Sequence, residues 1–390
     1  MKALSPGLEA LIQNKKVIVC VGSGGVGKTT TSAVIALQAA LVGKRALVLT
    51  IDPAKRLANS LGVSELGNTP VQIPIERFKE VGLEPKGELW AMMLDMKTSF
   101  DDIVQRHAPS EAAARNILDN KLYHYFSSSL AGTQEYAAAE RLYELHKEGA
   151  YDLIVLDTPP TTHALDFLEA PTRLVEAINS KALSWLHKPG AARGFGLMKM
   201  GSSYMLKTLG KFTGGEMLSE LGTFLKAFST LFDGFQERAS GVRTLLTSDR
   251  TTFAVVTAPN AGNIDEAIYF YDKLDAQTAR VGAFIANRVH PSWVPKEELA
   301  LPTIELLKQM EGISPAFDAL GGARKRDVIA RLKDNAREFQ ILAALDAEAI
   351  QRLRDHVHDT VPVMKVPYFS RDIHSLEGLN HVRTSIFGEA

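Results

Sequence analysis

The chain of 390 residues contains a single cysteine, Cys20. One cysteine cannot form a disulfide within the chain, and it cannot supply the paired Cys-x-x-Cys ligands of a structural zinc site. Because Cys20 lies inside an apolar run, residues 17–21, we interpret it as a small buried side chain. The lack of disulfides is typical of a reducing compartment, so we expect a cytoplasmic protein.

The sequence also lacks an excess of charge and any long hydrophobic run. Its 44 Lys and Arg residues balance 45 Asp and Glu residues, and the formal net charge is -1 at pH 7. This balance does not favour nucleic acid, and we expect no nucleic-acid partner. No run approaches the roughly 18 apolar residues that span a bilayer, and the N-terminus lacks the pattern of a secretory signal. Any contact with a membrane would have to be local and peripheral.

Hydrophobic residues make up 45% of the sequence, which is enough for a sizeable core. Short apolar runs are expected to form strands at 17–21, 45–51, 89–94, 152–156, 252–257, 281–286 and 361–366. Helical patterns lie between them, notably at 31–41, 134–147, 263–274 and 335–356. Strands that are apolar on both faces are typical of a parallel sheet covered by helices on both sides. The alternation predicts an α/β fold with a doubly wound, mostly parallel sheet in a single domain, residues 1–390.

Two long stretches, residues 98–148 and 171–248, interrupt this alternation. Both have mainly helical patterns, and neither has the Pro- and Ser-rich composition of a linker between independent domains. We therefore predict that they are insertions that form an α-helical subdomain on the sheet. Residues 293–333 are also expected to be helical, and the sequence assigns them no role.

Residues 22–30 read Gly-Ser-Gly-Gly-Val-Gly-Lys-Thr-Thr and lie between the first expected strand and a helix. The spacing of Gly22, Gly27, Lys28 and Thr29 matches G-x-x-x-x-G-K-[ST], a loop whose backbone N–H groups bind nucleotide phosphates. The N-terminus of the following helix adds positive potential. The predicted nucleotide-binding residues are Gly22, Gly24, Gly25, Val26, Gly27, Lys28, Thr29 and Thr30. Lys28 is expected between the β- and γ-phosphates as a catalytic charge, and the Thr29 hydroxyl is expected to bind Mg²⁺.

Two aspartates follow expected strands at the edge where this loop lies. Asp157 ends an apolar strand, where an unpaired charge is costly, so a role in the Mg²⁺ shell is a natural explanation. Asp52 is the better candidate to orient or deprotonate the attacking water, because phosphoryl transfer needs mainly placement and charge neutralisation. For each aspartate the alternative is a helix N-cap after a strand.

These segments together resemble the arsenite-pump and tail-anchored-protein-targeting ATPases, a branch of the dimeric P-loop ATPases with a deviant Walker motif. Residues 157–163, Asp-Thr-Pro-Pro-Thr-Thr-His, look like the second switch motif of that family. The resemblance implies an ATPase that uses ATP and Mg²⁺ and opens and closes as a dimer around nucleotide. It places Asp52 at the catalytic carboxylate and Asp157 at the Mg²⁺-proximal one. His163 would then couple nucleotide state to the helical subdomain, with a helix cap or an ordinary surface histidine as the alternative.

The resemblance also implies how the base is recognised. Asn287, after the sixth expected strand, lies in a segment similar to the adenine-contacting segment of the family, and its amide can both donate to and accept from a base edge. Pro367, followed by Tyr368 and Phe369, would cover the base with apolar surface. Ordinary core packing is the alternative for the two aromatic residues.

One departure from the family concerns Ser23. Members usually carry a lysine at this position, which reaches the phosphates bound by the partner subunit, and a serine supplies no such charge. Slow hydrolysis follows as a hypothesis, with Lys55 or Arg56 as the nearest replacement cations. An ATP-binding switch with little hydrolysis, or a heterodimer whose paralogous subunit supplies the lysine, are alternatives to a homodimeric ATPase. The single cysteine argues against an arsenite pump and against a zinc-clasped dimer.

The second insertion offers a surface for a partner. Residues 194–235 combine methionines, phenylalanines and glycines, and residues 217–235 have the apolar spacing of one helix about five turns long. Between residues 177 and 215 there are basic residues and no acidic ones. A hydrophobic protein client or an anionic membrane surface would fit this stretch. The alternative is an ordinary helical core with a basic rim.

Overall fold

The structure is a computed structural model that describes residues 6–51, 56–121, 123–124, 133–159, 164–179, 229–292, 294–310, 312 and 314–388. Its centre is an eight-stranded sheet with the strand order β3-β4-β2-β5-β1-β6-β7-β8. The strands are β1 (Val17–Val21), β2 (Arg45–Thr50), β3 (Val71–Gln72), β4 (Glu88–Met93), β5 (Leu153–Asp157), β6 (Thr251–Thr257), β7 (Val281–Val289) and β8 (Val363–Pro367). All neighbouring strands are parallel except β3, which pairs antiparallel with β4 at one edge.

Helices cover both faces of the sheet because its central strands are apolar on both sides. One face packs against α1 (Pro6–Asn14), α2 (Lys28–Leu41), α3 (Arg56–Leu61), α4 (Ile75–Glu80) and α20 (Leu376–Phe387). The other face packs against α8 (Thr133–Glu148), α14 (Phe232–Thr247), α15 (Ala261–Ala276) and the C-terminal part of α19 (Gly322–His356). Strands β1 and β5, in the middle of the order, are buried along their whole length. The predicted doubly wound fold is therefore confirmed.

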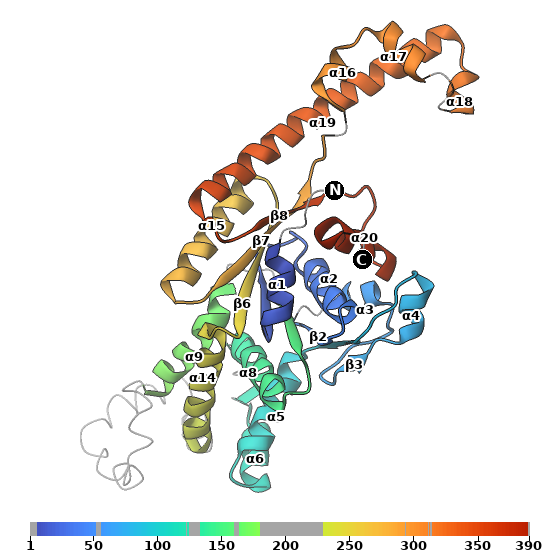
Figure 1. Ribbon diagram of the computed structural model, residues 1–390. Coiled ribbons are helices and arrows are strands. Elements are labelled where there is room, and N and C mark those ends of the chain that lie inside the picture. Colours follow the sequence, from blue (N-terminus) through green and yellow to red (C-terminus); the bar gives the residue numbers. More distant parts are fainter. Residues whose placement is uncertain are drawn as a thin grey trace, which may run out of the picture.

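A group of helices at one end of the sheet has its own hydrophobic core (Figure 1). It contains α5 (Met96–His107), α6 (Glu111–Leu118), α9 (Ala164–Asn179), η2 (Ser229–Leu231), α8 and α14. Segments from both predicted insertions thus pack against each other. The boundaries 98–148 and 171–248 for a subdomain of one ATPase domain remain a proposal.

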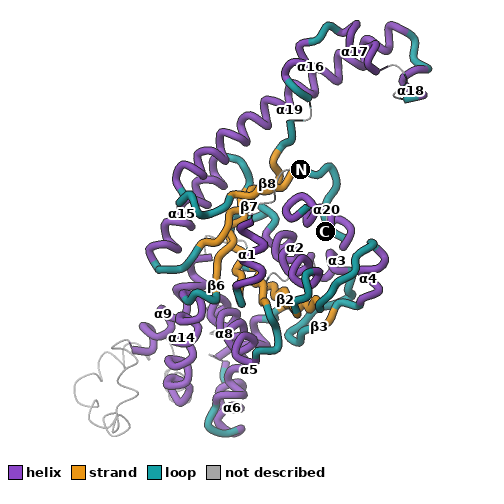
Figure 2. Tube along the Cα trace, viewed as in Figure 1, coloured by secondary structure: helices purple, strands orange, loops and turns teal. Residues whose placement is uncertain are grey.

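The segment between β7 and β8 forms an arm that projects away from the sheet (Figure 1). The arm consists of α16 (Lys296–Ala300), α17 (Thr303–Met310), α18 (Pro315–Asp318) and the N-terminal part of α19. The tube view shows α17 and α18 at its far end, on the opposite side of the sheet from α5 and α6 (Figure 2). Within the described ranges, no helix combines the length and apolar character needed to cross a bilayer.

Three predictions about the elements were wrong in detail. The edge strand β3 was missed, because two residues are too short for a hydrophobic pattern. The helix expected at 335–356 begins at Gly322, because its N-terminal half packs on α17. The helix expected at 217–235 does not end there: α14 begins at Phe232, after a 3₁₀ turn, and Phe235 lies within it. Residues 217–228 lie outside the described residues.

Candidate nucleotide-binding site

The phosphate-binding loop joins β1 to α2 and depends on glycine at several positions. Its φ angles are positive at Gly22 (148°), Gly25 (75°) and Gly27 (99°), a region that side chains disfavour. A Cβ atom at Gly22 would collide with the carbonyl oxygen of Val256 in β6, and one at Gly27 would collide with the side-chain amide of Asn287. The glycines therefore let the loop lie close to β6 and β7, which brings its backbone next to side chains of later strands.

Lys28 is the first residue of α2 and is only 5% exposed. Its Nζ donates hydrogen bonds to the carbonyl oxygens of Gly22 at 2.9 Å and Ser23 at 2.8 Å. These bonds fold the lysine side chain back over the loop that precedes it. The ammonium group is thus held against the start of the loop.

Asp157 accepts two threonine hydroxyl groups at the end of β5. Its Oδ2 accepts from Thr29 Oγ1 at 2.7 Å and from Thr50 Oγ1 at 2.8 Å. The sheet register explains this arrangement, since Asp157 lies opposite Cys20 in β1 and opposite Thr50 in β2. The carboxylate is fully buried, an environment that requires hydrogen bonds or a cation to offset the cost of desolvation.

Ser23, the second residue of the loop, is held by another helix. Its hydroxyl donates to the carboxylate of Glu266 in α15. Glu266 is an exposed residue. The side chain at this position therefore points toward α15 of its own chain. No feature of the sequence relates these two residues, which are 243 positions apart.

Asn287 connects the end of β7 to the phosphate-binding loop. Its Nδ2 donates to the Val26 carbonyl oxygen at 2.7 Å, and its Oδ1 accepts from the backbone N–H of Arg288. Arg288 has a φ of 62°, and the pairing of β7 with β8 shifts register between Ala286 and Val289. Such an irregularity redirects side chains at a strand end. Asn287 thus lies beside the loop.

Pro367 ends β8 directly beside β7, opposite Val289. The next residue, Tyr368, is 45% exposed, and its ring stacks on His290 with 5.5 Å between centroids and 15° between planes. Phe369 instead packs against the hydrophobic core. The alternative of core packing therefore applies to Phe369 and not to Tyr368.

The structure brings most of the predicted site residues together. The loop residues contact Asp157 through Thr29 and Asn287 through Val26. Asp52, Lys55 and His163 lie outside the described residues, and Arg56 is an exposed residue at the start of α3. The functional roles assigned to all of these residues remain predictions.

Sequence reasoning missed two polar residues of the site. Thr50 is the last residue of an apolar strand, and its hydroxyl could have been noticed as a polar group at the edge where Asp157 was expected. Glu266 lies on an ordinary amphipathic helix, and only the folded chain places it next to Ser23.

A doubly wound parallel sheet with this loop after β1, and with a threonine-bound aspartate at the end of β5, defines a P-loop nucleotide-binding protein. The family model described as "Anion-transporting ATPase" matches residues 15–300. The chain belongs to this ATPase family. The family prediction is thereby confirmed, and α17, α18 and α19 follow the matched region in the sequence.

Curated relatives include fungal and ciliate ATPases. The "ATPase get3" of Aspergillus terreus is 28% identical over 291 residues, which cover 73% of this chain and 77% of the relative. The "ATPase GET3" of Malassezia globosa is 29% identical over 180 residues (45% of this chain and 49% of the relative). The "ATPase ASNA1 homolog 1" of Paramecium tetraurelia is 30% identical over 179 residues, covering 45% of this chain. That alignment spans 50% of the relative, so these last two comparisons each cover about half of the other protein.

Proposed function

We propose that the protein is a Mg²⁺-dependent ATPase in which nucleotide drives dimer opening and closing, and that this cycle controls binding of a hydrophobic or membrane-associated protein partner. The observation that carries the enzymatic part is the convergence of Thr29 and Thr50 on Asp157 directly beside the phosphate-binding loop. The family match and the names of the relatives support ATP as the nucleotide.

Different groups of the loop would make different contacts with the phosphates. Backbone N–H groups of residues 22–30 would bind the phosphate oxygens, and the N-terminus of α2 would add its positive potential. Lys28 would exchange its bonds to the Gly22 and Ser23 carbonyl groups for bonds to phosphate oxygens. Because both acceptors are neutral carbonyl groups, a charged phosphate would compete with them effectively.

The residues present fit Mg²⁺, which prefers hard oxygen ligands. The Thr29 hydroxyl and the Asp157 carboxylate already lie 2.7 Å apart. The Thr29 hydroxyl would bind the ion directly, and the Asp157 carboxylate would bind it through a water molecule in the Mg²⁺ coordination shell. When bound, the ion would neutralise charge on the phosphates.

Asp52 is the proposed catalytic carboxylate. It lies two residues after Thr50, whose hydroxyl is bonded to Asp157 at the same edge of the sheet. A carboxylate there would orient or deprotonate the water that attacks the γ-phosphate, while Lys28 stabilises the developing charge.

One observation favours the alternative of an ATP-binding switch with little hydrolysis. Ser23 carries no charge, and its hydroxyl is bonded to Glu266 of its own chain, so this position would supply neither a cation nor a free hydroxyl to a partner subunit. Help from a paralogous subunit would restore the missing charge, and Arg56 is the described cation nearest in sequence to Asp52.

The partner surface is proposed for residues 194–235. The part of it that the structure describes lies in the core of the helical group, where Leu231, Phe232 and Phe235 are buried. A hydrophobic client or membrane contact would therefore use residues 194–228, which lie outside the described residues. No nucleic acid is proposed as a partner.

Steady-state ATP hydrolysis with and without Mg²⁺ tests the enzyme. We expect hydrolysis by the wild type, a loss of at least about 100-fold in Lys28→Ala and Asp52→Asn, and no loss in Lys16→Ala, a control at the opposite end of β1. Wild-type hydrolysis at the level of Lys28→Ala, together with tight ATP binding, would instead support the switch. Native mass measurement with and without nucleotide would detect a dimer or a second chain.

A further inference from the structure

A buried carboxylate, Asp346, is one of the contacts that join α19 to the sheet, and it lies about two-thirds of the way along the helix. Asp346 is 6% exposed, and its Oδ2 accepts two hydrogen bonds from one residue, His290. The backbone N–H of His290 lies 2.7 Å away, and the ring Nδ1 lies 2.9 Å away. This contact links α19, which lies beyond the family-matched region, to a residue within that region.

His290 is held on its other sides by aromatic rings. Tyr368 stacks on it in a nearly parallel arrangement, and the Phe339 ring of α19 lies 6.1 Å from it. The bond from Asp346 to Nδ1 prevents rotation of the imidazole, and the stacked tyrosine is fixed in turn. Almost half of the Tyr368 surface remains exposed.

The His290–Tyr368 ring pair lies at the two strand ends that carry the proposed base-recognition residues. His290 is three residues after Asn287, whose amide is bonded to the Val26 carbonyl oxygen in the phosphate-binding loop. Tyr368 follows Pro367 directly, and its backbone N–H donates to the carbonyl oxygen of Val289. A shift of the ring pair would therefore move both strand ends, because the backbone bond joins them next to the pair.

We propose that Asp346 is a positioning residue for the nucleotide base, through which the arm sets the base-dependent part of nucleotide affinity. The proposal rests on the proposed function, since it takes residues 287 and 367 as the base site. Asp346 itself does not contact nucleotide. It holds His290 and Tyr368 so that Asn287 and Pro367 have one fixed separation. The bond from Asn287 to the Val26 carbonyl oxygen links the base site to the phosphate-binding loop. Lys28, Thr29 and Asp157 are also held by contacts of their own, so the phosphate contacts should depend on Asp346 much less than the base contacts do.

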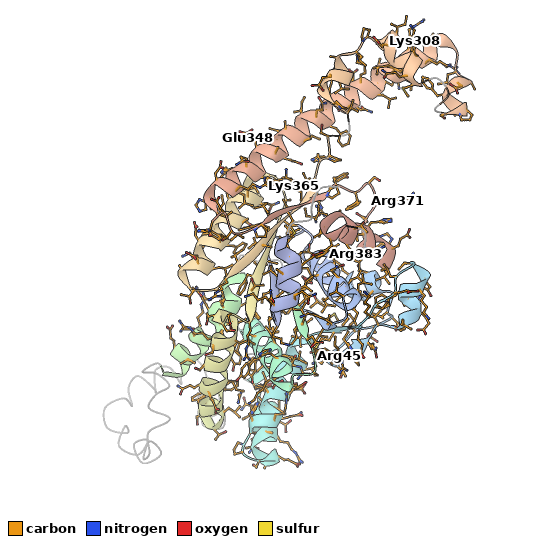
Figure 3. The ribbon with its side chains drawn as sticks, in the orientation of Figure 1. Arg45, Lys308, Glu348, Lys365, Arg371 and Arg383 are labelled. Atoms are coloured by element: carbon orange, nitrogen blue, oxygen red, sulfur yellow. The ribbon has the colours of Figure 1, made fainter. Side chains whose placement is uncertain are left out.

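Calorimetry with two ligands separates the base from the phosphates. MgATP and magnesium tripolyphosphate share the phosphate chain, and only MgATP has a base. We expect Asp346→Ala to weaken MgATP binding about tenfold, the scale of one lost stacking or hydrogen-bond contact, and to change tripolyphosphate binding less than about twofold. Glu348→Gln is the matched control: it removes a negative charge from the same helix at an exposed position, labelled in Figure 3, and should change neither affinity.

A second variant guards against a folding defect. His290→Ala removes the same contact from the side of β7 and should give the same selective loss of MgATP binding. Equal weakening of both ligands, or wild-type affinities in folded Asp346→Ala and His290→Ala proteins, would overturn the proposal. If the wild type binds MgATP no more tightly than magnesium tripolyphosphate, the base contributes no affinity, and both the proposed base site and this inference fail. If instead both ligands are weakened equally, or both variants keep wild-type affinities, only the inference fails and the proposed function stands.

Discussion

At the scale of single residues, Thr50 shows how one hydroxyl contributes to both fold and site. It is 1% exposed and donates to the buried carboxylate of Asp157, which also accepts from Thr29. A buried hydrogen bond of this kind contributes about 1 kcal/mol to stability. It also fixes the orientation of a carboxylate proposed to lie in the Mg²⁺ shell.

The Thr50→Val variant should therefore lose about 1 kcal/mol of unfolding free energy and about tenfold in ATP hydrolysis. The control is Thr252→Val, because Thr252 is equally buried in β6 and its hydroxyl donates to the Arg280 carbonyl oxygen, away from the site. Thr252→Val should lose stability and keep its hydrolysis rate. Denaturant unfolding and steady-state assays measure the two effects, and equal rate losses in both variants would contradict the role of Thr50.

Cys20 provides a second test at this scale. Burial in β1 raises the pKa of its thiol to about 12, and a hydrogen bond with Ser32 opposes the shift only in part. The nucleophilic thiolate is therefore scarce at neutral pH in the folded protein.

We expect native Cys20 to react with a disulfide reagent at about pH 8 only as fast as the protein unfolds. The unfolded chain in guanidinium should react at once and consume one equivalent, which calibrates the assay. Stoichiometric labelling of the native protein within seconds would show that β1 opens far more readily than its burial indicates.

At the scale of elements, α8 and α14 are joined by an ion pair inside the helical group. Glu140 Oε1 lies 2.5 Å from Arg238 Nε, with side-chain exposures of 0% and 14%. Burial raises the pKa of Glu140, and the charge of Arg238 opposes this shift. Removal of one partner leaves the other charge buried and uncompensated.

Arg238→Ala should lower the free energy of unfolding by about 3 kcal/mol or more. Arg106 provides the matched control, because it pairs with Glu144 in the same helical group at 2.7 Å, yet its side chain is 43% exposed. Arg106→Ala should cost about 1 kcal/mol or less. Chemical denaturation would measure both, and similar losses would mean that the Glu140 carboxylate is hydrated.

His107, at the end of α5, makes this group of helices sensitive to acid. Burial and the positive charge of Arg238 lower the pKa of His107, with Arg106 acting in the same direction and Glu144 opposing them. The unfolded chain then binds the proton more tightly than the folded one, so stability falls as the pH drops through about 6.5 and toward the lowered pKa.

The melting temperature of His107→Gln should therefore fall less than that of the wild type between about pH 7.5 and pH 5.5. His146 in α8 offers an independent check, because burial and the charges of Arg250 and Lys16 lower its pKa too. His146→Gln should also reduce the acid sensitivity. A wild-type pH dependence in both variants would exclude these histidines as its source.

At the scale of the whole molecule, the parts of the fold that depend on local pattern could be predicted from the sequence. Seven strands and the loop at residues 22–30 follow from apolar runs and motif spacing, and the structure places them within a few residues of those positions. The contacts of Ser23 with Glu266 and of His290 with Asp346 join positions 243 and 56 residues apart. Such pairs arise from the three-dimensional packing, and no local periodicity encodes them.

The two ends of the long helix α19 would move by different amounts if the helix tilted. It has 35 residues, and about 24 of them, or about 36 Å, extend from Asp346 to its N-terminal start at Gly322. Because the C-terminal part of α19 is held on the sheet through contacts such as those of Asp346 and Leu353, a tilt of about 5° about that part would displace the N-terminal start by about 3 Å. A small rotation of α19 beside the sheet would therefore become a larger displacement of α17 and α18 at the end of the arm. Conversely, a force applied at that end would exert a large torque on the contacts beside the sheet.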